Sequence, residues 1–74
     1  MRINLKRKLT FEEIVEALIY YKEEYGISYI TWSRKTDVSR KTITRMVQGK
    51  THRTTDEIRT KLSEAIQKTY RNLK

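Results

Sequence analysis

Apolar residues recur at three- and four-residue spacing in four stretches of the chain, which is the pattern of amphipathic helices. The expected helices are residues 11–25, residues 29–36, residues 40–48 and a last helix that begins at Thr54 or Thr55. A chain of 74 residues has room for one hydrophobic core and no second one. The pattern therefore predicts a single all-α domain.

The first and last helices have the clearest boundary signals. Thr10 and Glu13 have the spacing of a capping box, in which each side chain bonds a free backbone N–H, and Gly26 supplies a stop. Thr54 and Glu57 repeat the capping-box spacing before the last helix. The apolar stripes expected in the core are Phe11, Ile14, Val15, Leu18, Tyr21 and Tyr25 in the first helix and Ile58, Leu62, Ala65 and Ile66 in the last.

The middle of the chain predicts two short helices with a tight turn between them. Ser28 and Ser39 each precede a helical stretch, where a serine hydroxyl can accept a hydrogen bond from the first turn. Asp37 stands at the turn and is among the few residue types that tolerate a positive φ. Ile30 and Trp32 are the bulky apolar residues of the earlier helix, and Trp32 is expected in the core. In the later helix, the apolar face is Ile43, Met46 and Val47, and the polar face is Arg40, Lys41, Thr44, Arg45 and Gln48.

The 17 basic and 9 acidic residues give a formal net charge of +8, and this charge is unevenly distributed. Residues 1–8 contain four basic residues and no acid, whereas residues 9–27 contain five glutamates against Lys22. Residues 28–53 contain seven basic residues against Asp37. Positive charge concentrated in two stretches is typical of a protein that binds a polyphosphate such as a nucleic acid.

Residues 1–8 are interpreted as a basic N-terminal arm that precedes a domain of residues 9–74. The alternation of Ile3 and Leu5 with polar residues is compatible with a short edge strand, and the basic end of the segment is compatible with a disordered arm. As an arm, it would lie along DNA phosphates or in a minor groove. Its cations are Arg2, Lys6, Arg7 and Lys8.

The composition argues against an enzyme, a cofactor and a membrane span. Without cysteine the chain forms neither disulfides nor thiolate metal sites, which is compatible with a reducing compartment. His52 has no second histidine or paired acid nearby, so a metal site is not expected. No apolar run is long enough to cross a bilayer, and the N-terminus has no secretory pattern. We expect a cytoplasmic protein, in the bacterial cytosol or nucleoid.

The stretch 28–49 resembles the helix-turn-helix of the Cro and cI-repressor type, which is the lambda-repressor-like or XRE family. The similar positions are Ser28, Trp32-Ser33, Val38-Ser39, Thr42-Ile43, Arg45-Met46 and Gly49-Lys50. Asp37 stands where the family commonly has glycine, and Tyr29 stands where it often has glutamine. A similar Val-Ser-x-x-Thr-Ile-x-Arg pattern also occurs in lac-repressor-type headpieces. The resemblance implies a small bundle of four to five helices around a central helix-turn-helix.

The resemblance further implies a sequence-specific regulator that binds double-stranded DNA, of the phage or bacterial repressor kind. An α-helix fits the major groove, and its N-terminal residues reach base edges. The residues expected at base edges are Arg40, Lys41, Thr44 and Arg45. The residues expected at backbone phosphates are Ser28, Tyr29, Thr42, Gln48, Lys50, His52 and Arg53.

Two further expectations concern protein partners. One short recognition helix reads too few base pairs for selectivity, so we expect a homodimer. Tyr70 and Leu73 continue the last apolar stripe beyond what a small domain needs, as a dimer contact or as a frayed end. The alternative function is a protein-interaction module, an antirepressor or modulator, whose glutamate-rich first helix docks a basic partner. Those glutamates, Glu12, Glu13 and Glu16, equally suit the positive end of the helix dipole.

Overall fold

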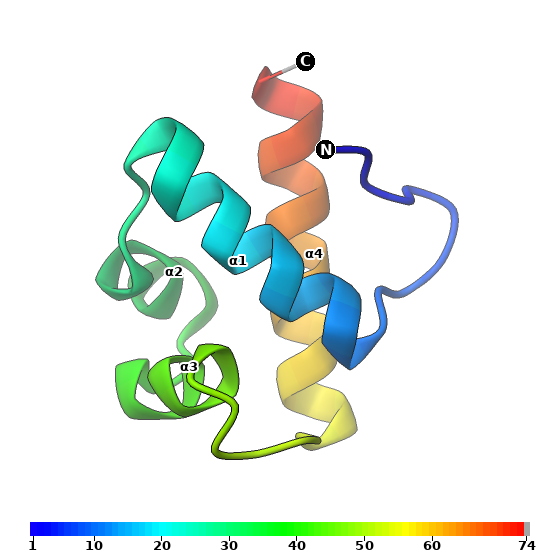
Figure 1. Ribbon diagram of the computed structural model, residues 1–74. Helices are drawn as coiled ribbons and strands as arrows, with labels where there is room; N and C mark the ends of the chain where they lie inside the picture. The colour runs from blue at the N-terminus through cyan, green and yellow to red at the C-terminus, as the bar shows by residue number, and fades with distance from the viewer. Residues whose placement is uncertain (74) are drawn as a thin grey trace.

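Four α-helices make up the fold in the computed structural model, which describes residues 1–73 (Figure 1). The helices are α1 (Phe11–Tyr25), α2 (Tyr29–Thr36), α3 (Arg40–Val47) and α4 (Asp56–Leu73). Within residues 1–73 no strand is formed. The helix α1 packs against α4 and α3, and α2 packs against α3 and α4, so all four helices share one core. The prediction of an all-α domain is confirmed.

Trp32 belongs to the core, as predicted, and is 0% exposed. Other completely buried residues come from the apolar stripes of α1, α3 and α4, and these are Ile14, Ala17, Leu18, Ile43, Leu62 and Ile66. The expectation for Tyr25 is wrong, because this ring is 51% exposed. Tyr25 lies in the last turn of α1, beyond the core cluster, where helical periodicity continues but the packing partners end.

The boundary signals are confirmed for α1, and of the two starts expected for α4 the one at Thr55 agrees with the structure. The capping box of Thr10 and Glu13 is present, and α1 ends at Gly26 with φ of 69°. The last helix is capped by Thr55, whose Oγ1 accepts a hydrogen bond from the Ile58 N–H at 3.2 Å. The capping box expected from Thr54 and Glu57 does not form, because the cap lies one residue later and Ile58 has no polar group to reciprocate.

The turn between α2 and α3 is held by hydrogen bonds on both sides. Asp37 has φ of 60°, as its position predicts, and its N–H donates to the Ser33 carbonyl at 2.8 Å. The Thr36 hydroxyl donates to the Trp32 carbonyl at 2.7 Å and accepts from the Val38 N–H at 3.3 Å. Because Thr36 and Val38 are also buried, the turn is anchored in the core and determines how α3 follows α2.

Residues 1–9, which we call the N-terminal strap, comprise the predicted arm of residues 1–8 and Leu9, and they run beside α1 and α4 without forming an edge strand (Figure 1). Gln67 Nε2 of α4 donates to the carbonyls of Asn4 and Arg7 at 2.8 and 2.7 Å. At the end of the strap, the Leu9 N–H donates to Ser63 Oγ at 2.9 Å. Ile3 and Leu9 are buried in the core. The interpretation of this segment as a disordered arm is therefore wrong.

Candidate nucleic-acid interface

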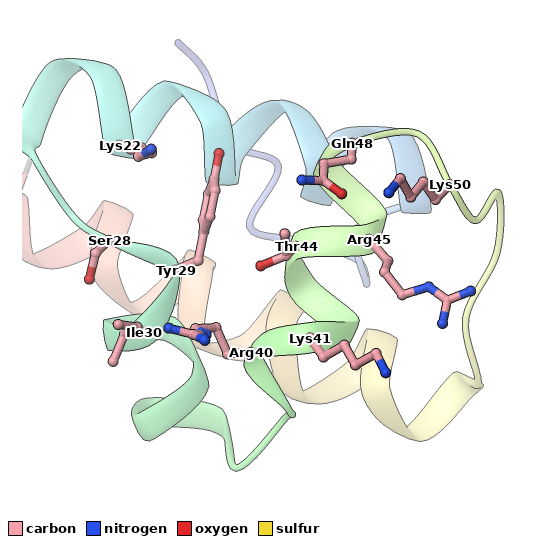
Figure 2. A pocket seen from close by; sticks show the side chains of 10 residues that line it. All are labelled: Lys22, Ser28, Tyr29, Ile30, Arg40, Lys41, Thr44, Arg45, Gln48 and Lys50. Atoms are coloured by element: carbon pink, nitrogen blue, oxygen red, sulfur yellow. The ribbon is translucent and has the colours of Figure 1, made fainter.

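An open trough lies between the exposed face of α3, the start of α2 and the last turns of α1 (Figure 2). Its lining includes five cations, which are Lys22, Arg40, Lys41, Arg45 and Lys50. The other lining residues are Ser28, Tyr29, Ile30, Thr44 and Gln48. No aspartate or glutamate is among these ten residues, so the surface, which we call the basic trough, favours an anionic partner.

The cationic lining of the trough depends on the packing and capping of α3, which set the direction of its polar side chains. Ile43 and Met46 are buried on one side of α3, which turns the cationic side outward. Ser39 caps the helix through a hydrogen bond from the Lys41 N–H at 3.2 Å. At the other end, Gly49 has φ of 75°, and the Lys50 N–H donates to the Arg45 carbonyl at 3.0 Å. This reversal of the chain returns the Lys50 side chain to the trough.

The trough cations are not neutralised by the rest of the structure. Within residues 1–73, the cations in ion pairs are Arg7, Lys8, Arg59 and Lys61, and none of these lines the trough. The Lys22 ammonium lies 5.0 Å from the centroid of the Tyr29 ring, which connects the end of α1 to the start of α2. Burial, followed by the charge of Glu23, raises the pKa of the Tyr29 hydroxyl.

The structure brings together most of the residues expected at an interface with DNA. All four residues assigned to base edges, Arg40, Lys41, Thr44 and Arg45, line the trough. Four of those assigned to phosphates also line it, namely Ser28, Tyr29, Gln48 and Lys50. Thr42 and Arg53 lie in a neighbouring hollow that shares Arg45. His52 lines neither of these two surfaces and lies in a groove with Glu12 and Glu16 of α1.

The four strap cations lie elsewhere. Arg7 makes two hydrogen bonds to the Glu13 carboxylate at 2.7 and 3.0 Å, and Lys8 Nζ lies 2.9 Å from the nearer oxygen of Asp56. Arg2 and Lys6 line a separate hollow whose walls include Glu13 and Tyr70. None of the four strap cations is therefore among the lining residues of the trough, and a contact of the arm with DNA stays a prediction.

Two trough residues were not expected from the sequence. Lys22 comes from α1, and its proximity to α2 is a tertiary contact that spacing along the chain does not reveal. Ile30 is 41% exposed and lines the trough. For Ile30 a signal was present, because residues two apart on a helix point in nearly opposite directions and Trp32 is buried. Ile30 and Trp32 therefore could not both face the core, and Ile30 is the one that faces outward.

No helix within residues 1–73 is long and apolar enough to cross a membrane. No group of three or more histidines and acids in that part of the chain is placed to hold a metal ion. Comparison of the chain with protein-family models, with curated proteins and with solved structures finds no match.

Proposed function

We propose that this protein is a helix-turn-helix transcriptional regulator that binds double-stranded DNA sequence-specifically, with α3 in the major groove. The observation that carries the proposal is the composition of the basic trough, which has five cations, no acid and the whole polar face of α3. DNA presents about one negative charge per 1.7 Å of helix axis, so an unneutralised cationic surface gains affinity by releasing counterions.

Base reading is assigned to the outward residues of α3. Arg40 and Lys41 occupy its first turn, and Arg45 lies one turn later. Arginine and lysine donate to guanine O6 and N7, and a threonine hydroxyl or methyl can contact several bases. Thr44, between these cations, suits a close approach of α3 to the base edges because its side chain is short.

Phosphate binding is assigned to the walls of the trough. Ser28 and Tyr29 lie at the start of α2, and Gln48 and Lys50 lie at the end of α3 (Figure 2). Lys22, stacked on Tyr29, adds a cation from α1. Contacts of this kind position a protein on the duplex without reading its sequence. The resemblance to Cro and cI-type repressors supports repression as the regulatory outcome.

The test is selection of sites from random duplex DNA, followed by affinity measurements on the selected site. Replacing Arg40 or Arg45 with alanine should cost about 1–3 kcal/mol and relax preference at one position. Lys68→Ala is the matched control, since Lys68 is an exposed cation of α4 outside the trough. No enriched site, or equal losses for Arg45→Ala and Lys68→Ala, would contradict the proposal.

A second candidate, the protein-interaction module, is favoured by the groove between α1 and the segment after α3. Phe11 and Val15 give this groove apolar walls, and Glu12 and Glu16 give it negative charge. A basic, partly apolar peptide has the complementary chemistry. Pull-down with the wild type and with a Glu12→Lys variant tests this alternative. A module of this kind alone would show no salt-dependent preference for a particular DNA sequence.

A further inference from the structure

A second surface is lined by side chains from the last turns of α1 and α4 and by Met1; the two helix ends point toward the same end of the molecule (Figure 1). We call it the aromatic patch, and its residues are Met1, Tyr20, Tyr21, Tyr25, Tyr70 and Leu73. Four large apolar side chains are strongly exposed within residues 1–73, namely Met1, Tyr25, Ile30 and Leu73. Three of the four belong to the patch, and Leu73 is 47% exposed. Apolar surface gathered in one place typically marks a protein contact.

The patch is built to keep its shape. The rings of Tyr20 and Tyr25 lie 6.1 Å apart, and Tyr21 lies 5.3 and 5.6 Å from these two rings. Tyr21 also lies 5.9 Å from Trp32, so the patch is joined to the centre of the core. Aromatic side chains held in this way lose little conformational entropy on binding, which is why tyrosine is enriched in interfaces.

Opposite charges border the patch on its two helices. On the α1 side, Glu24 is exposed and directly precedes Tyr25, and its carboxylate is close enough to help raise the pKa of the Tyr20 hydroxyl after burial and Tyr25. On the α4 side, Arg71 is exposed and follows Tyr70 in the chain. In a two-fold contact, each copy offers the same surface in reversed orientation. In such a dimer, the acidic border on α1 of each copy would lie opposite the basic border on α4 of the other copy, so the contact between opposite charges would form twice.

We propose that the aromatic patch is a self-complementary interface that joins two copies of this chain, with Leu73 and Tyr25 at its centre and Glu24 facing Arg71 of the other copy. The patch shares no residue with the basic trough, so the contact through the patch itself covers no lining residue of the trough. The inference uses no part of the trough and does not depend on the proposed DNA binding.

The experiment is sedimentation equilibrium of the full chain over a range of concentrations. We expect the wild type to reach twice the mass of one chain, and Leu73→Lys or Tyr25→Lys to weaken dimerisation by at least about tenfold. Ile30→Lys is the matched control, because Ile30 is 41% exposed on α2 and lies outside the patch. Circular dichroism checks that each variant retains its helices, which is expected since all three positions are exposed.

A charge exchange tests the orientation. Glu24→Arg and Arg71→Glu should each weaken the dimer by up to about fivefold, and the double variant should restore it. A wild type that stays monomeric, a dimer that Leu73→Lys leaves intact, or a failure of the double variant to recover would each overturn the proposal. If a variant loses the dimer but still binds a single DNA half-site, the change affects the dimer interface alone. The proposed DNA binding is then unaffected by that result.

Discussion

The N-terminal strap and the basic trough have similar charge but different surroundings. Both are rich in lysine and arginine, and both are expected from the sequence to contact DNA. In the strap, Arg7 forms an ion pair with Glu13, and Lys8 forms one with Asp56. In the trough, none of the five cations has an acidic partner within residues 1–73. Positive charge thus supports folding in one region and remains available for a ligand in the other.

The largest effect that separates the two regions is expected from the end of the strap. Leu9 is buried, so Leu9→Ala should lower the free energy of unfolding by about 2–5 kcal/mol. Ile30→Ala, at an exposed trough position, should change it by no more than about 0.5 kcal/mol. Urea titration followed by circular dichroism measures both. Equal stabilities of the two variants would show that the strap is not part of the fold.

A smaller effect is expected from the hydrogen bond between Leu9 and Ser63. Ser63→Ala removes the acceptor of the buried Leu9 N–H and should cost about 1–3 kcal/mol of stability. Glu64→Ala changes the next, exposed residue of α4 and is the control. The same urea titration applies. A neutral Ser63→Ala would mean that Leu9 finds another partner and that the strap is attached more loosely than described.

Salt dependence compares single lysines of the two regions. Lys50→Ala should weaken binding to all DNA sequences alike and lower the slope of log affinity against log salt concentration by about one. Lys8→Ala should leave the slope unchanged, because Lys8 is paired with Asp56 away from the trough. Fluorescence anisotropy at several salt concentrations measures the slope. If Lys8→Ala lowers it as much as Lys50→Ala, the strap contacts DNA after all.

The smallest effect is the acid dependence contributed by the strap. Hydrogen bonds from Arg7 and then from the Thr10 backbone lower the pKa of Glu13 from 4.5 to about 2. A lowered carboxyl pKa stabilises the fold fully above pH 4.5, and this stabilisation is lost as the pH falls towards 2. Glu13→Gln should therefore flatten the fall of stability across this range, which thermal melts at several pH values would detect.

The control for the acid measurement is Glu12→Gln, since Glu12 is exposed and makes no ion pair within residues 1–73. This variant loses one carboxylate from the same turn of α1 and should keep the wild-type acid dependence. If Glu13→Gln and Glu12→Gln behave alike, the pairing of Arg7 with Glu13 makes no measurable contribution in solution.

Signals within a few residues of the sequence were sufficient to predict the boundaries of α1 and the turn before α3. The start and end of α1 follow from Thr10, Glu13 and Gly26, and the turn before α3 follows from Asp37. The last helix shows where such signals are ambiguous. Thr54 and Thr55 are both able to cap it, and the choice of Thr55 places Asp56 at the first helical position, where it meets Lys8 of the strap.

By itself, the sequence determined four helices, the burial of Trp32 and the cationic outer face of α3, because capping, periodicity and charge act over a few residues. Only the tertiary structure decided which cations remain free. It brought Lys22 to Tyr29 and paired Arg7 and Lys8 with Glu13 and Asp56. It also gathered Tyr25 and Leu73 into one exposed patch. Asp56 is 48 residues from Lys8 in the chain, and contacts across such separations depend on how the helices pack together.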